Sequence, residues 1–133
     1  MPAWTSRYVG IPFADSGDDI SSGVNCYGLL RTVFAREVGI DLPCHSELSA
    51  ADIETSNTSM LADIAGGPWT PVEQPLQLFD VVLLRGNPMH VGLLVSPDVI
   101  LHIWRKTDSM LMPIDHPRIR HRIIGYYRHK DLA

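Results

Sequence analysis

One cysteine and two histidines are of the residue types that nucleophilic catalysis needs. Cys26 lies where a loop rich in Gly, Ser and Asp, residues 10–24, gives way to an apolar run with helical spacing. The unpaired amides and the dipole at a helix N-terminus stabilise a thiolate and lower the pKa of a thiol placed there. His90 and His102 lie in two successive strand-like segments. One could act as the base for Cys26 and the other could orient that base. Without these histidines, a packed and inert thiol explains Cys26 as well.

The two histidines can work together only if they project from the same face of a sheet. If they lie directly opposite each other in an antiparallel hairpin, an odd-length loop must connect their strands. A two-residue turn at Pro97-Asp98 with regular pairing would instead place the histidines on opposite faces. The hypothesis of a joint site therefore predicts an odd connection or a β-bulge near residues 96–98.

The elements that must position these residues follow from the hydrophobic spacing. A helix is predicted from Asn25 or Cys26 to about Val38, with Gly39 as its C-terminal cap. The stretch 46–67 is predicted to be partly helical, although it contains several Ser and Thr residues. Strands are predicted at 78–85, 90–96, 99–104 and 121–128. Helices followed by a run of hairpin-linked strands indicate an α+β fold with an antiparallel sheet.

Composition limits the classes of function. The 133 residues predict a single domain, residues 1–133, large enough to bury a core. A net charge of −4 argues against a protein that mainly binds nucleic acid. The sequence contains no run of about eighteen apolar residues, the length that would predict a membrane span. The first ten residues, "MPAWTSRYVG", lack the apolar core of a secretory signal. We therefore expect a cytoplasmic protein as synthesised, with reduced cysteines.

The remaining cysteine and histidines do not suggest a metal centre. Cys44 and His45 are adjacent, but their spacing to Cys26 matches no zinc module with paired ligands. We expect no metal or other cofactor and a free Cys44 thiol in a loop. Three further histidines are expected on the solvated surface, namely His116, His121 and His129. The basic run "RIRHR" at 118–122 is expected there as well. The three tryptophans are expected to pack in or around the core.

Two segments together resemble a known family. "NCYGLLRTVFAREVGIDLP", followed by "LFDVVLLRGNPMHVGLLVSPDVILHI", is similar to the NlpC family of papain-like cysteine peptidases, which cut bacterial cell-wall peptides. The resemblance extends from residue 7 to residue 129 and is closest to the short versions encoded with phage tail-assembly genes. The family pattern is an Asp-Cys-x-Gly-Leu helix start, a His-Val-Gly strand and a polar residue one strand further on. It implies Cys26 as nucleophile, His90 as base and His102 as orienting residue. It also implies a papain-like fold in which the cysteine helix packs on the antiparallel sheet.

The sequence departs from the family pattern at two places. The residue before the cysteine is usually Asp, which helps to recognise the free amine of the wall peptide, and here it is Asn25. The asparagine keeps the hydrogen-bonding capacity but not the charge. The first strand after the helices usually starts with Gly-Asp, and here the pair is Phe79-Asp80. Tyr8 resembles a family aromatic near the substrate pocket. The resemblance thus implies Tyr8 and Asn25 as substrate-binding residues.

The implied reaction is acyl transfer from a peptidoglycan stem peptide to the Cys26 sulfur, without a metal or organic cofactor. The implied setting is a phage or phage-like tail that meets the cell wall, with tail proteins as partners. Two alternatives stay open. One is a structural tail-tip assembly protein with weak or no hydrolase activity. The other is an acyltransferase or amidase that uses the same residues on a substrate outside the wall.

Overall fold

The computed structural model describes residues 2–14, 18–19, 21–42, 68–86, 90–104 and 107–132. Within that part of the chain, no helix has the length and apolar character that crossing a membrane requires. The predicted helical stretch 46–67 and the pair Cys44-His45 lie outside the described residues. In chain order, the elements are η1 (Ala3–Tyr8), β1 (Asp18–Asp19), β2 (Gly23–Val24), α1 (Cys26–Val33), η2 (Phe34–Val38), β3 (Trp69–Val72), β4 (Val81–Leu84), β5 (His90–Ser96), β6 (Val99–His102), β7 (Met110–Pro113), β8 (Ile123–His129) and η3 (Lys130–Leu132).

Helix α1 begins at Cys26, and both of its predicted ends are confirmed. Its N-cap is Asn25, whose Oδ1 accepts a hydrogen bond from the Gly28 N–H at 2.8 Å. The helix continues as the single π-helical turn η2 and ends at Gly39, which has φ +79°. A left-handed residue at this position is the usual helix stop, and glycine adopts it without a steric penalty.

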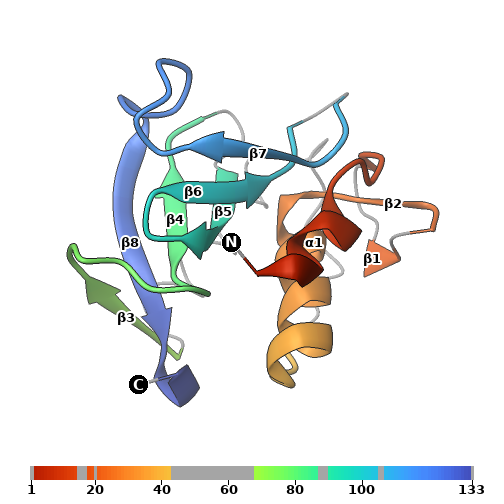
Figure 1. Cartoon of the computed structure of the whole chain (residues 1–133), viewed down its shortest axis with the longest axis horizontal. Helices are drawn as coiled ribbons and strands as arrows, with labels where there is room; N and C mark the ends of the chain where they lie inside the picture. Colours follow the sequence, from red (N-terminus) through yellow and green to blue (C-terminus); the bar gives the residue numbers. More distant parts are fainter. Residues whose placement is uncertain are drawn as a thin grey trace.

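The six main strands form one antiparallel sheet in the order β3-β8-β4-β5-β6-β7 (Figure 1). Strands β4, β5, β6 and β8 correspond to the four that the sequence predicts. The outer strands β3 and β7 are not predicted. Each is four residues long, and each contains a proline, Pro71 or Pro113. Proline is tolerated at a sheet edge because that side of the strand needs no N–H donor, but it weakens the strand signal in the sequence.

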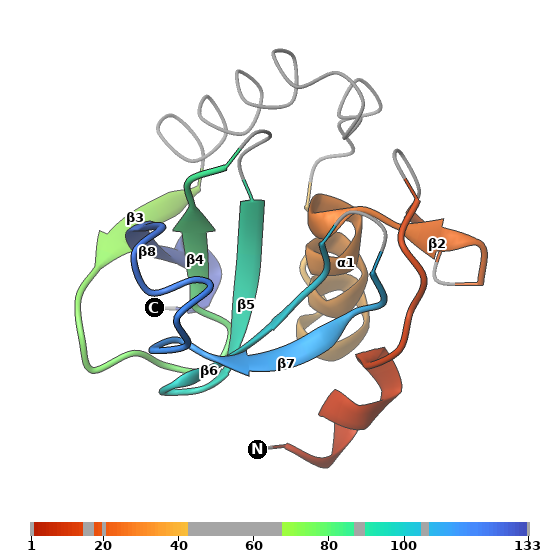
Figure 2. The same ribbon diagram turned by 90° about the horizontal axis from the view of Figure 1, so that it is seen from above.

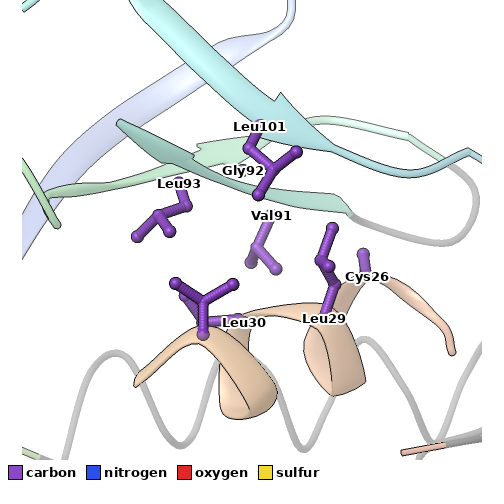
Figure 3. Close-up of a pocket in the computed structure, with 8 residues that line it drawn as sticks. Cys26, Leu29, Leu30, Val91, Gly92, Leu93 and Leu101 are labelled. Carbon is purple, nitrogen blue, oxygen red and sulfur yellow. The ribbon is translucent and has the colours of Figure 1, made fainter. Parts of the chain in front are cut away.

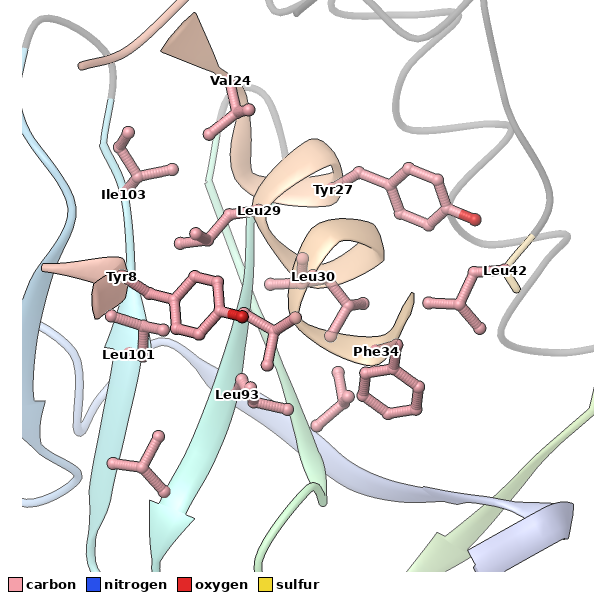
Figure 4. Close-up of a cluster of buried hydrophobic side chains, with 14 of the residues drawn as sticks. Tyr8, Val24, Tyr27, Leu29, Leu30, Phe34, Leu42, Leu93, Leu101 and Ile103 are labelled. Atoms are coloured by element: carbon pink, nitrogen blue, oxygen red, sulfur yellow. The ribbon is translucent and has the colours of Figure 1, made fainter. Parts of the chain in front are cut away.

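The sheet has a hydrophobic cluster on each face. On one face, α1 packs against β5 and lies to one side of the sheet (Figures 1 and 2). Tyr8 and the helix residues Leu29, Leu30 and Phe34 belong to this cluster, which Figure 4 shows together with Leu93 of β5. The opposite face buries Leu76, Val82, Leu84, Leu94, Ile100, Met112 and Ile119. The central strands are therefore buried on both faces, and this explains why β4 is continuously apolar.

An ion pair fixes the start of β4 to β8. The Asp80 side chain is fully buried and accepts two hydrogen bonds from Arg128, at 2.7 and 2.8 Å. It also accepts one from the Gln77 N–H at 2.8 Å. The preceding residue, Phe79, has φ +73°. Phe79 thus adopts the left-handed conformation at the position where the family pattern has glycine.

Candidate active site

His90 and His102 share one face of the sheet, as the hypothesis of a joint site requires. In the β5–β6 ladder Leu93 pairs with Leu101, and the register shifts between Leu94 and Ser96, where Ser96 pairs with Val99. The connection is therefore a two-residue turn combined with a bulge. The bulge adds one residue to β5, so that His90 and His102 lie on the same face. The turn with regular pairing alone would place them on opposite faces. The prediction of a bulge near residues 96–98 is confirmed.

The two imidazoles are in direct contact. His90 Nε2 lies 3.1 Å from His102 Nδ1. Both side chains are buried, and His102 Nε2 has no hydrogen-bond partner among the described residues. Burial lowers the pKa of His90 to about 3, with further lowering by His102 and Arg122. Burial likewise lowers the pKa of His102 to about 4, with smaller contributions from Arg118 and His116. Both rings are thus neutral at pH 7, and one donates the shared hydrogen bond to the other.

Cys26 lies at the first turn of α1, against the start of β5. The residue as a whole is partly exposed, and its side chain lines a small apolar pocket with Leu29, Val91, Gly92 and Leu101 (Figure 3). Val91 of β5 lines the same pocket, and its backbone acts to lower the pKa of the thiol. The structure therefore places the thiol next to the residue that follows His90.

The resting thiol is protonated at neutral pH. Burial raises the pKa of Cys26, while backbone hydrogen bonds from Val91, Tyr27 and Cys26 itself act in the opposite direction. The expected lowering by the helix N-terminus is therefore outweighed by desolvation. A neutral thiol and a neutral imidazole are the resting forms.

The hydrogen bond to His102 determines which nitrogen of His90 can act as a base. His90 Nε2 is engaged by His102, so Nδ1 is the nitrogen left to take a proton. Residues of β5 that lie an even number of positions from His90, such as Leu94, pack on the face opposite α1. Val91 packs on the face that the helix covers. The Cys26 thiol therefore lies near Val91, and the His90 imidazole projects from the residue directly before Val91.

The two predicted substrate-binding residues have structural roles in this arrangement. Asn25 is buried, and its side chain caps α1. Tyr8 is 1% exposed, and its hydroxyl donates a hydrogen bond to Glu37 Oε2 at 2.5 Å. Burial, followed by the bond to Glu37, raises the pKa of Tyr8 to about 12. Contact of either residue with a substrate stays a prediction.

One aromatic residue, Trp104, packs against the histidine pair, and sequence reasoning did not connect it with the pair. The Trp104 ring lies 4.4 Å from the His102 ring, edge to face at 90°, and stacks on His90 at 6.1 Å and 26°. Its position two residues after His102 was the available signal, because such residues share a face of an extended chain. His129, expected on the surface, is buried against Trp69 and Phe34. That expectation is wrong because charged neighbours in the sequence do not determine which side chains of β8 other segments cover.

Comparison with solved structures shows the fold. No protein-family model matches the chain, and no curated protein matches it. An NlpC/P60 family protein from Bacillus cereus ATCC 10987 superposes with a TM-score of 0.67 at 18% identity over 93% of this chain. An NLP/P60 family protein of Staphylococcus aureus subsp. aureus Mu50, described as similar to a lipoprotein, gives 0.64 at 15% identity over 92% of this chain. The chain spans 37% and 38% of these two proteins, respectively.

A third similar structure is the NlpC/p60 domain of the peptidoglycan hydrolase SagA. Its TM-score is 0.59 at 19% identity, and the match covers 94% of this chain and 92% of that domain. In the present structure the helix that begins at Cys26 packs on a six-stranded antiparallel sheet, so the predicted α+β fold is confirmed. The chain therefore has the fold of the NlpC/P60 family proteins.

Proposed function

We propose that the chain is a cysteine hydrolase that cleaves a peptide bond of peptidoglycan stem peptides. The observation that carries this proposal is the hydrogen-bonded pair His90–His102 at the start of a strand whose next residue, Val91, lines the same small pocket as Cys26. A nucleophile, a base and a residue that orients the base are the parts that acyl transfer to sulfur requires. The similar fold of a peptidoglycan hydrolase domain, that of SagA, supports the choice of substrate.

In the proposed mechanism, His90 Nδ1 takes the proton of the Cys26 thiol as the sulfur attacks the carbonyl carbon of the scissile amide. Backbone amides at the start of α1, including that of Cys26, donate hydrogen bonds to the resulting oxyanion. His90 then returns the proton to the leaving amine, and a thioester remains. Water attacks the thioester after giving a proton to His90. The acid is released, and the thiol regains its proton.

His102 acts in this mechanism through His90. Its Nδ1 holds His90 Nε2 at 3.1 Å, which fixes the ring and leaves Nδ1 for the thiol. The imidazolium that forms transiently on His90 is stabilised because the neutral His102 Nδ1 accepts a hydrogen bond from its Nε2–H. This is a positioning role, and its loss should be less damaging than the loss of either reacting group.

The test is digestion of purified peptidoglycan followed by mass analysis of the released fragments. The proposal predicts fragments with newly formed amine and carboxyl ends, produced by the wild type and not by Cys26→Ala. Cys44→Ala is the matched control, since it removes the other thiol of the chain. A product in which the released acyl group is bound to an acceptor amine, and does not end in a free carboxyl, would indicate an acyltransferase instead.

One observation favours the alternative of a structural assembly protein. The Cys26 thiol has a raised pKa, whereas an enzyme with a preformed thiolate would have a lowered one. Selective alkylation at pH 7 separates the two functions. Rapid labelling of Cys26 relative to Cys44 indicates an activated thiol, whereas slow labelling together with no release of wall fragments indicates an assembly role. We place either function in a phage or phage-like tail on the resemblance of the sequence alone, with tail proteins as partners.

A further inference from the structure

One arginine shares an aromatic neighbour with the histidine pair. The guanidinium carbon of Arg118 lies 4.4 Å from the centre of the Trp104 ring. The same indole stacks on His90 and meets His102 edge to face. Arg118 is exposed, so its charged group lies at the surface, whereas the imidazoles below are buried. Trp104 therefore links the candidate site to a surface cation.

Within the part of the chain that the structure describes, the Arg118 guanidinium donates no hydrogen bond. Its backbone N–H donates to His116 Nδ1 at 3.1 Å, but no carboxylate among the described residues pairs with its side chain. Arg128 and Arg7, by contrast, pair with Asp80 and Glu37. A guanidinium that stacks on an aromatic ring keeps its in-plane N–H groups free, and their fork matches the two oxygens of a carboxylate. Stacking also reduces the entropy lost when that carboxylate binds.

The charges around Arg118 point to an anionic ligand. Residues 116–122 contain three arginines and two histidines but no acidic residue, in a chain whose net charge is −4. Arg118, Arg120 and Arg122 are all exposed. The lowering of the His102 pKa by Arg118, and of the His90 pKa by Arg122, shows that these cations act on the histidine pair. A carboxylate at this surface would be attracted towards the ends of β5 and β6 that carry the pair.

We propose that Arg118, held over Trp104, binds a carboxylate of the substrate and makes the site selective for anionic peptides. The inference rests on the proposed function for the position of the scissile bond, but the binding step itself does not require turnover. Arg118 is a specificity-determining residue in this account. It forms no bond with the reacting atoms, and its removal should affect anionic peptides only.

The test compares two synthetic stem peptides that differ in one group. In one, a chosen residue carries a free carboxylate, and in the other the same group is a carboxamide. Dissociation constants are measured at fixed salt with Cys26→Ala protein, which cannot turn the peptides over. We expect about tenfold tighter binding of the carboxylate form, the size of a charge-assisted hydrogen-bonded pair. The Trp104 indole N–H signal in NMR spectra should move with this peptide.

Three variants make the test specific. Arg118→Gln should weaken binding of the carboxylate form to the level of the carboxamide form and leave the latter unchanged. Arg118→Lys should retain only part of the preference, because it keeps the charge but lacks the planar fork. Arg120→Gln is the matched control: it removes the same charge from the same segment, but its side chain bonds to His121. It should keep the full preference.

The inference is wrong if wild-type affinity is equal for the two peptides, or if Arg118→Gln weakens both equally. It is also wrong if Arg120→Gln removes the preference to the same extent, since a diffuse charge would then explain it. These outcomes differ from a failure of the proposed function. A protein that prefers the carboxylate peptide but hydrolyses no peptide supports the carboxylate site and contradicts the hydrolase. Hydrolysis of both peptides without preference supports the hydrolase and contradicts the carboxylate site.

Discussion

His90 Nε2 lies 3.1 Å from His102 Nδ1, although the pairing of β5 with β6 does not place the two residues directly opposite. Leu93 pairs with Leu101, so continuation of that register puts Gly92 opposite His102, and His90 is a diagonal neighbour. Diagonal neighbours on a sheet face are within reach of long or aromatic side chains. Gly92 lies on the same face and leaves room there for the side chains of Ile100 and Val82, since a Cβ at this position would lie 3.0 Å from Ile100 Cδ1 and 3.2 Å from Val82 Cγ1.

The proposed catalytic roles predict a graded loss of activity. Cys26→Ala should abolish turnover of wall peptides and leave the fold intact, because the change is small. His90→Ala should be nearly as damaging, since no base remains, whereas His102→Ala should cost less because it removes only orientation. Initial rates and circular dichroism of all three variants check this. Wild-type activity in Cys26→Ala, or its loss in Cys44→Ala, would contradict the assignment.

The buried histidines predict that acid destabilises the fold before the carboxyl groups titrate. Folded pKa values of about 3 and about 4 lie below the value of about 6.5 in an unfolded chain. Between these values the unfolded state binds more protons, so the free energy of unfolding falls as the pH drops below 6.5. It should be nearly constant above pH 7.5. One such histidine costs about 2 kcal/mol at pH 5.

Thermal melts between pH 8 and pH 5 measure this effect. The melting temperature of the wild type should fall steadily below pH 6.5. His102→Asn removes one of the two titrating groups and should show a shallower decline, even if it is less stable at pH 8. A melting temperature that stays level down to pH 5 would mean that the imidazoles are hydrated or charged in the folded protein.

The cap at Asn25 predicts opposite effects of two substitutions. Asn25→Ala removes the acceptor of the Gly28 N–H and should destabilise the fold by about 1 kcal/mol. Asn25→Asp keeps the acceptor and adds a negative charge at the helix N-terminus, so stability should be unchanged or slightly higher. The same charge next to Cys26 should raise the thiol pKa further and slow its alkylation at pH 7. Denaturant melts and alkylation rates measure the two effects separately.

The left-handed conformation of Phe79 predicts an unusual order of stability. The ring stacks on Trp4 at 5.5 Å and meets Phe34 edge to face at 6.1 Å. Phe79→Ala should lose these contacts and keep the strained φ of +73°, at a cost of about 3 kcal/mol. Phe79→Gly loses the same contacts but relieves the strain. It should therefore be about 1 kcal/mol more stable than Phe79→Ala.

Urea unfolding of the two Phe79 variants tests this order. Glycine normally destabilises relative to alanine because it increases the entropy of the unfolded chain. A result in that normal direction would show that residue 79 does not keep the left-handed conformation in solution.

The sequence determined the local features and their order along the chain. The spacing of apolar residues and the glycine after it fixed the helix from Cys26 to Val38, and alternation with turn residues fixed the four inner strands. The requirement that His90 and His102 share a face was enough to predict an odd connection or a bulge, and the structure has the bulge. Each of these features depends on neighbours in the chain, so a single sequence contains the information.

Tertiary structure decided what depends on contacts between distant segments. The edge strands β3 and β7 exist because β8 and β6 offer unpaired backbone groups, and their own prolines hide them in the sequence. The pKa of Cys26 rises because β5 covers a thiol that the helix terminus alone would activate. Trp104 and Arg118 join the histidine pair through stacking between segments of the chain. Desolvation and stacking are sums over neighbours in space, which residue spacing does not specify.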